Sequence, residues 1–126
     1  RIINNDNYDS HALNYLSYKL AVKKINLDFA LTLITSALKI EPNNPFFLDT
    51  LGWVQFQRKN YNSSVFYLEK AVTIEPNNSE IIDHLGDCYL MLNRIDEAKF
   101  EWKKALQYET NKEISSMIKN KIDLYE

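Results

Sequence analysis

Residues 40–52 read IEPNNPFFLDTLG and residues 74–86 read IEPNNSEIIDHLG, so two stretches share one pattern at an offset of 34 positions. The chain has 126 residues and only two glycines, Gly52 and Gly86, which occupy the same place in this pattern. Two of its three prolines, at positions 42 and 76, coincide as well. When the rarest residues coincide at one fixed period, the sequence indicates a protein built from stacked repeats.

The period divides most of the chain into three units, which we place at residues 11–44, 45–78 and 79–112. Each unit reads as two helices. In the middle unit Asn44 is a good N-cap, and Pro45 suits the first helical position, where no backbone hydrogen bond is lost. Leu48, Leu51 and Val54 follow at helical spacing. A second apolar stripe at the same spacing precedes the next asparagine-rich turn, so each unit is predicted to be a helical hairpin.

Small residues occupy the places where the two helices of a unit must approach closely. Gly52 and Gly86 lie on the first helices, and the second helices contribute Ala30, Ala37, Ser64, Ala71, Ala98 and Ala105. A glycine inside a helix costs about 0.5–1 kcal/mol relative to alanine. Its presence at the same place in two units indicates that the neighbouring helix leaves no room for a side chain. We therefore expect a solenoid of antiparallel helix pairs.

This pattern resembles the tetratricopeptide repeat, a helix–turn–helix unit of about 34 residues with the signature W-x2-L-G-x2-Y, then A-x3-F, Ala and Pro. The third unit matches at Ile82-x2-Leu85-Gly86-x2-Tyr89 and at Ala98-x3-Trp102. The middle unit departs at Gln55, where an aromatic residue is usual. The first unit departs most, with Asn14, Ser17, Tyr18 and Ala21 in place of the first-helix signature. The resemblance implies an all-α, right-handed superhelical solenoid.

The whole chain, residues 1–126, is interpreted as a single domain of this kind. Residues 113–126 form an apolar stripe with charges opposite, which predicts a capping helix over the last repeat. A membrane-surface helix would need a strongly basic polar face, which this segment lacks. Residues 1–10 read as a linker or the end of a preceding repeat, with Asp9 or Ser10 capping the first helix. Since about three repeats are the minimum for stability, we expect further repeats upstream.

The composition argues against several functional classes. The 15 lysines and arginines are scattered and the net charge is −2, whereas nucleic-acid binding normally needs a basic face. No apolar run is long enough to span a membrane. His84 and Cys88 lie four residues apart on one helix, but two ligands do not make a metal site. There is no glycine-rich loop or nucleophile motif, so we expect no enzymatic activity and no cofactor.

In tetratricopeptide solenoids the first helix of each pair lines the concave side, and the resemblance nominates the inward-facing positions as a partner-binding surface. These are Tyr15, Lys19, Lys23, Phe46, Asp49, Thr50, Trp53, Phe56, Asp83, His84, Asp87 and Met91. Trp53 either anchors a partner or packs between adjacent first helices. The carboxylates of Asp49, Asp83 and Asp87 either read a basic or extended peptide or form an ordinary solvated helix face.

One subclass of the family grips the C-terminal carboxylate of chaperone tails with Lys, Asn, Asn, Lys and Arg at fixed places. Those places hold Tyr15, Lys19, Thr50, Glu80 and His84 in this chain. Only Lys19 is a permanent cation, and Glu80 has the wrong sign for a carboxylate ligand. The sequence therefore disfavours carboxylate-clamp binding.

We interpret the chain as a non-catalytic protein–protein interaction scaffold or adaptor that presents a preformed groove to a peptide, loop or helix of another protein. Two alternatives remain open. In the first, the chain is the recruitment arm of a larger enzyme or transport complex. In the second, it is a module for homo-oligomerisation. A looser likeness, on LDTLGWV and IIDHLGDCY, is to the C-terminal repeats of large bacterial tetratricopeptide proteins, some of which are envelope lipoproteins. The compartment, cytoplasmic or periplasmic, stays open.

Overall fold

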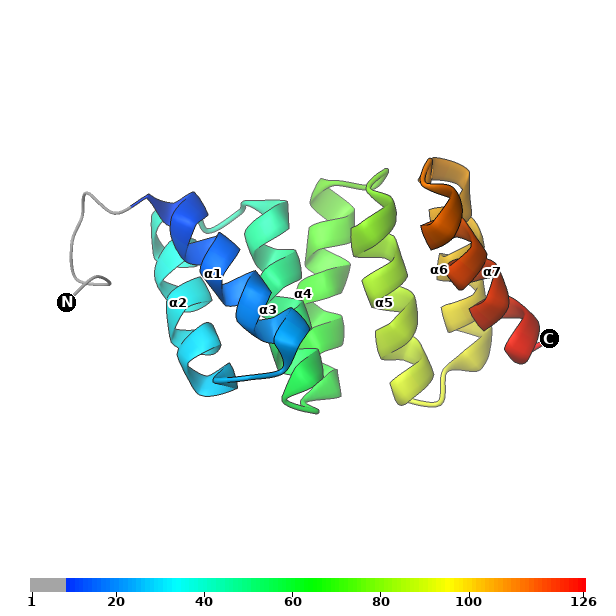
Figure 1. Cartoon of the computed structure of the whole chain (residues 1–126), viewed down its shortest axis with the longest axis horizontal. Helices are drawn as coiled ribbons and strands as arrows, with labels where there is room; N and C mark the ends of the chain where they lie inside the picture. The colour runs from blue at the N-terminus through cyan, green and yellow to red at the C-terminus, as the bar shows by residue number, and fades with distance from the viewer. Residues whose placement is uncertain (1–8) are drawn as a thin grey trace.

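The computed structural model describes residues 9–126, which form seven helices joined by short turns (Figure 1). The helices are α1 (Ser10–Lys23), α2 (Leu27–Ile40), α3 (Pro45–Gln57), α4 (Tyr61–Ile74), α5 (Ser79–Met91), α6 (Ile95–Tyr108) and α7 (Lys112–Leu124). Most of the linker predicted for residues 1–10 lies outside the described residues. The starts of α2, α4 and α6 are 34 residues apart, as are those of α3 and α5. The helix boundaries therefore follow the period of the sequence.

The helices pack mainly as the pairs α1–α2, α3–α4 and α5–α6, and each pair packs against the next. The predicted all-α solenoid of helix pairs is thus confirmed. The helix α7 lies against α6 and is drawn in front of it in Figure 1. Its buried side chains Ile118 and Ile122 join the same core cluster as Trp102 of α6 and Leu85 of α5. In this way α7 covers apolar surface at the C-terminal end of the solenoid.

Side-chain caps mark the first helix of each pair. Asn44 accepts hydrogen bonds from the backbone N–H groups of Phe46 and Phe47, and Pro45 occupies the first turn. Asp9, Asn78 and Asn111 cap α1, α5 and α7 in the same manner. The second helices α2, α4 and α6 have no side-chain cap. Because a side-chain cap satisfies backbone donors that the helix cannot, these residues fix where the first helices begin.

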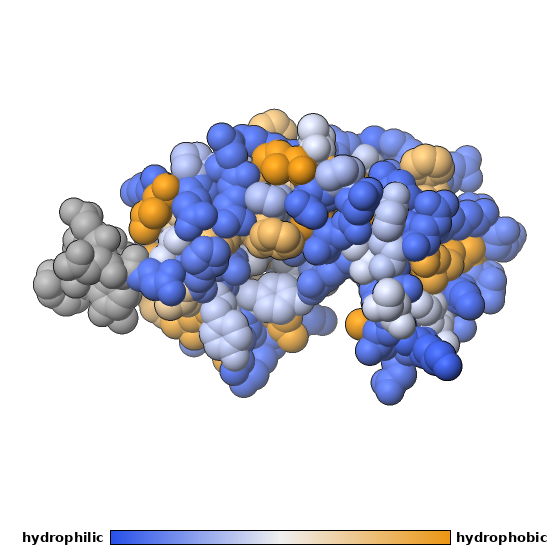
Figure 2. All heavy atoms as spheres, turned by 90° about the horizontal axis from the view of Figure 1, so that it is seen from above, coloured by the Kyte–Doolittle hydropathy of each residue, from blue (hydrophilic) through white to orange (hydrophobic). Residues whose placement is uncertain are grey.

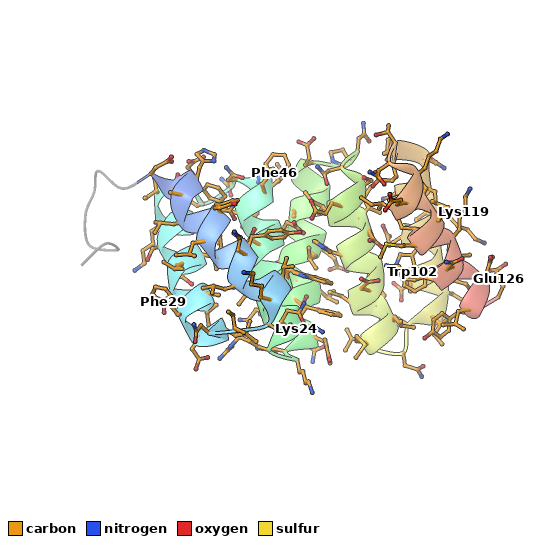
Figure 3. The ribbon with its side chains drawn as sticks, viewed as in Figure 1. Lys24, Phe29, Phe46, Trp102, Lys119 and Glu126 are labelled. Carbon is orange, nitrogen blue, oxygen red and sulfur yellow. The ribbon has the colours of Figure 1, made fainter. Side chains whose placement is uncertain are left out.

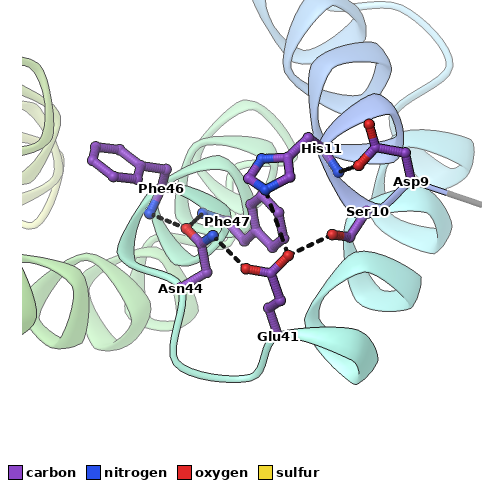
Figure 4. Close-up of polar contacts among 7 residues, drawn as sticks. All are labelled: Asp9, Ser10, His11, Glu41, Asn44, Phe46 and Phe47. Carbon is purple, nitrogen blue, oxygen red and sulfur yellow. Dashed lines mark hydrogen bonds and ion pairs between the residues drawn. The ribbon is translucent and has the colours of Figure 1, made fainter.

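A glutamate at the end of a pair ties back to the start of that pair. Glu41 accepts hydrogen bonds from the Ser10 hydroxyl at 2.6 Å and from the Asn44 side chain at 3.1 Å (Figure 4). In the same place of the third pair, Glu109 accepts from the Ser79 hydroxyl at 2.7 Å. These hydrogen bonds lower the pKa of both carboxyl groups below the usual range. In each of these two pairs, the serine–glutamate bond joins the start of the first helix to the end of the second.

The two glycines lie where the helices of a pair meet, as the sequence predicts. A Cβ atom built on Gly52 would lie 2.6 Å from Leu68 Cγ, and one built on Gly86 would lie 2.5 Å from Trp102 Cδ1. Both distances are shorter than any tolerated carbon–carbon contact. Trp102, which Figure 3 labels, is fully buried. The glycines thus allow a large side chain of the second helix to pack directly on the backbone of the first.

Candidate functional site

The concave side of the solenoid is the candidate site. A space-filling view from above shows it as a notch in the lower outline, between the N-terminal and C-terminal parts of the molecule (Figure 2). A cavity of about 320 Å³ lies between α1, α3 and α5, and one of about 440 Å³ lies between α5 and α7. Glu80 lines both cavities, so they adjoin. We call the two cavities together the concave groove.

The floor of the groove contains a buried ion pair whose histidine stacks on an aromatic ring. Asp49 of α3 lies 2.8 Å from His84 Nδ1 of α5, and both side chains are buried. Burial alone would lower the pKa of His84, but the Asp49 carboxylate outweighs it and raises that pKa to about 9. The His84 ring stacks on Trp53 at 3.9 Å between centroids, and Trp53 stacks on Phe56 at 4.4 Å. His84 is therefore protonated at neutral pH and packed between two helices.

The C-terminal part of the groove contains a second charged cluster. Lys121 of α7 donates to Asp83 Oδ1 at 2.6 Å and to Asp87 Oδ1 at 2.8 Å. Asp87 Oδ1 also accepts from Trp102 Nε1 at 3.1 Å. Burial and the Asp83 carboxylate raise the pKa of Asp87, and Lys121 opposes that rise. The ammonium of α7 thus partly neutralises two carboxylates of α5.

The predicted partner-binding residues differ in solvent exposure. Asp49, Thr50 and His84 are buried, while Trp53, Phe56, Asp83 and Asp87 are half-buried; the exposed residues are Tyr15, Lys19, Lys23, Phe46 and Met91. The carboxylates of Asp49, Asp83 and Asp87 are each engaged by a cation, so they do not form a free acidic strip. The Trp53 ring stacks on the His84 ring of α5 and is half-buried, so it packs against a neighbouring first helix and keeps part of its surface exposed.

Further residues outside that set line the groove. Among them are Asn14, Tyr18 and Glu80 in its first cavity, while Lys121 of the last helix contacts Asp83 of the second cavity. The Tyr18 hydroxyl donates to Glu80 Oε2 at 2.5 Å, so α1 reaches across α3 to α5. Burial and the Glu80 carboxylate raise the pKa of Tyr18 above its ordinary value. The signal for Tyr18 was in the sequence: it stands 34 residues before Gly52, where the repeat usually has a small residue.

Neither a metal centre nor a membrane span is found in the part of the chain that the structure describes. No group of three or more His, Cys, Asp or Glu side chains there could hold a metal ion. His84 pairs with Asp49, and the Cys88 thiol lies buried 2.8 Å from the Ser64 hydroxyl. None of the helices in residues 9–126 is both long and apolar enough to cross a membrane.

Comparison with known proteins agrees with this architecture. Residues 55–119, more than half of the chain, match the family model described as tetratricopeptide repeat. The chain therefore belongs to the tetratricopeptide repeat family, whose domains are typically non-catalytic interaction modules, as the sequence signature indicated. No curated protein sequence matches the chain.

Solved structures with the same fold cover nearly the whole chain. The first tetratricopeptide domain of Spaghetti (RPAP3), bound to the HSP90 peptide SRMEEVD, superposes with a TM-score of 0.79 at 20% identity over 92% of this chain and 89% of that one. The type III secretion translocator chaperone SycD of Yersinia enterocolitica, in an alternative dimer, gives 0.82 at 15% identity over 96% of each chain. The Sgt2 domain from Aspergillus fumigatus gives 0.75 at 22% identity over 90% and 79%. At these identities the likeness establishes the fold.

Proposed function

We propose that the chain is a non-catalytic scaffold or adaptor module that binds an extended peptide or a helix of another protein in the concave groove. The observation that supports this is the pair of adjoining cavities, of about 320 and 440 Å³, along α1, α3 and α5. Cavities of this size admit side chains of a bound segment. The exposed rings of Tyr15 and Phe46 at the first cavity are suitable anchors for such a segment.

The walls of the groove are held in place before any partner arrives. The Asp49–His84 pair and the Trp53 stack join α3 to α5, and the Tyr18–Glu80 hydrogen bond joins α1 to α5. A preformed site loses little conformational entropy on binding, so more of the contact energy appears as affinity. The related RPAP3 domain, which was solved with a bound peptide, supports a peptide as the class of ligand. Carboxylates in the groove would repel a phosphate backbone, so we propose a protein partner and not a nucleic acid.

The structure indicates which substitutions can test this proposal. Asp49 and Asp87 hold helices together, so changing them would disturb the fold as well as the surface. Tyr15 and Phe46 are 63% and 47% exposed, and their replacement by alanine removes little packing. Phe66 of α4 and Phe100 of α6 are 63% and 65% exposed and line neither groove cavity. They are matched aromatic controls on the second helices.

Peptides selected from a displayed random library on the wild-type chain would be measured against each variant by fluorescence anisotropy. We expect Tyr15→Ala and Phe46→Ala to weaken binding at least about tenfold, which corresponds to about 1.4 kcal/mol. Phe66→Ala and Phe100→Ala should change it less than twofold. The opposite ranking, or failure to select any peptide, would overturn the assignment. A mass that rises with concentration, and falls when a selected peptide is added, would identify a second copy as the occupant.

A further inference from the structure

Glu80 is a carboxylate of the concave groove that no cation of the described residues neutralises. Asp49 is paired with His84, and Asp83 and Asp87 share Lys121. Glu80 is exposed, and among residues 9–126 no lysine, arginine or histidine nitrogen lies within salt-bridge distance of it. Glu109, which lines the second cavity, also lacks a cationic partner among the described residues, but it accepts from the Ser79 hydroxyl. In the first cavity Glu80 is the one carboxylate without such a partner.

Aromatic rings surround this carboxylate in the first cavity. Tyr15 and Tyr18 from α1 and Phe46 from α3 line the same cavity of about 320 Å³ as Glu80. The Tyr18 hydroxyl bonds Glu80 Oε2, which fixes the carboxylate against the wall. The faces of aromatic rings carry negative potential and attract cations. This chemistry already occurs at the rim, where Lys19 Nζ lies 5.3 Å from the centroid of the Tyr15 ring.

The cavity also has a hydrogen-bond acceptor without a donor. The side-chain oxygen of Asn14, which lines the cavity, is buried and has no hydrogen-bond partner among the described residues. Buried polar atoms are nearly always paired in folded proteins, so an orphaned acceptor calls for an explanation. Glu80 and Asn14 Oδ1 are both acceptors in the cavity wall. The cavity thus combines ring faces, one carboxylate without a cationic partner among the described residues, and an acceptor without a donor.

We propose that this cavity binds the guanidinium group of an arginine side chain in the partner peptide. An arginine offers a planar cation that stacks on tyrosine and phenylalanine rings, and it presents several N–H donors in a fixed plane to a carboxylate and an amide oxygen. A lysine ammonium is a compact, strongly hydrated charge and uses the rings less well. The inference rests on the proposed peptide-binding function and names the residue class that the groove selects.

This selectivity is opposite to that of a carboxylate clamp. The places where a clamp has cations hold Tyr15, Glu80 and His84 here, and His84 is already paired with Asp49. A C-terminal carboxylate entering the cavity would meet Glu80 with no compensating free cation on α3 or α5 in the described groove. The cavity therefore favours a positive group and disfavours a negative one.

The test uses small probes with the folded chain, observed by ¹H–¹⁵N NMR titration. The probes are the acetylated amides of arginine, lysine and citrulline, with the arginine-free peptide MEEVD as an acidic comparison. We expect the arginine amide to bind with a dissociation constant of about millimolar order and to shift the resonances of Tyr15, Tyr18 and Phe46. The uncharged citrulline amide should bind at least about fivefold more weakly. Equal binding of the lysine amide, or stronger binding of MEEVD, would overturn the assignment to arginine.

Substitutions can distinguish a failure of the arginine site from a failure of the proposed peptide-binding function. Glu80→Gln should weaken the arginine amide at least about fivefold, while Asp96→Asn, which removes a fully exposed carboxylate of α6, should leave it unchanged. Lys19→Gln removes a like charge at the rim and should strengthen binding about twofold. If selected peptides depend on Tyr15 and Phe46 but neither contain arginine nor respond to Glu80→Gln, the arginine site is wrong and the peptide groove stands. If no peptide depends on Tyr15 or Phe46, the groove itself is wrong.

Discussion

The buried pair of Asp49 and His84 makes the stability of this protein depend on pH in the range from neutral to mildly alkaline. The two side chains lie 2.8 Å apart in the floor of the groove, and the pKa of His84 is raised from its ordinary value of 6.5 to about 9. Below pH 6.5 the folded and unfolded chains both hold the proton, and the pair stabilises the fold fully. Between 6.5 and 9 only the folded chain holds it, so the stabilisation declines as pH rises and is lost above 9.

The size of the effect follows from the pKa difference between the two states. At about 1.4 kcal/mol for each unit of pKa, the change from 6.5 to about 9 corresponds to at most about 3 kcal/mol of unfolding free energy. Burial also raises the pKa of the Cys88 thiol to about 12, which lowers stability further above pH 9. A His84→Gln variant keeps Cys88 but removes the imidazole together with its stack on Trp53, so the comparison uses the pH slope of stability and not its absolute value. The difference in pH slope between the wild-type protein and His84→Gln therefore reports the contribution of the Asp49–His84 pair.

Urea unfolding followed by circular dichroism at several pH values between about 6 and 9 would measure this difference. We expect the wild-type unfolding free energy to fall by about 2–3 kcal/mol over this range and that of His84→Gln to change by less than half as much. Equal pH slopes for the two proteins would show that His84 is not held protonated by Asp49. A wild-type stability that rises with pH over this range would refute the sign of the argument.

Two further substitutions test the packing and the charges around α5. Gly86→Ala should lower the unfolding free energy by about 1–2 kcal/mol, because overpacking against Trp102 exceeds the gain of about 1 kcal/mol in helix propensity. The loss should be smaller in a Trp102→Leu background. An unchanged loss in that background would exclude the contact with Trp102 as its cause. Lys121→Met should destabilise by about 1–2 kcal/mol at neutral pH, because Asp83 and Asp87 lose their shared cation. That deficit should narrow in acid, because Asp87, whose pKa is raised by burial, takes up a proton. A deficit that persists in acid urea titrations would point to lost packing instead.

The repeat made most of the fold predictable from the sequence. The period, the asparagine caps and the glycines are local signals that recur, so each unit supports the interpretation of the others. Gly52 and Gly86 even predicted which surfaces meet, and the structure places Leu68 and Trp102 against them. Such agreement is expected where each local preference is consistent with the global architecture.

The pairings within the groove could not be predicted in the same way. A period assigns residues to one face of a helix but does not identify the side chain opposite. Asp49 and His84 are 35 residues apart, and Lys121 is 34 residues from Asp87, so each contact depends on how neighbouring pairs are stacked. For that reason the sequence grouped three carboxylates as one acidic strip, whereas the structure shows each engaged by a cation. The sequence showed only that Tyr18 stands where the repeat usually has glycine. It did not indicate the hydrogen bond that the structure shows from Tyr18 to Glu80.

The contact between α7 and α5 gives the last helix two roles at once. It covers the apolar end of the core through Ile118 and Ile122, and it supplies through Lys121 the counter-ion for Asp83 and Asp87. In a chain shortened to end before residue 112, Asp83 and Asp87 would therefore lose their counter-ion, and Ile118 and Ile122 would no longer cover the core. The preference of such a chain among ligands would move further towards cations. The length of the chain at its C-terminal end is in this sense a determinant of binding selectivity as well as of stability.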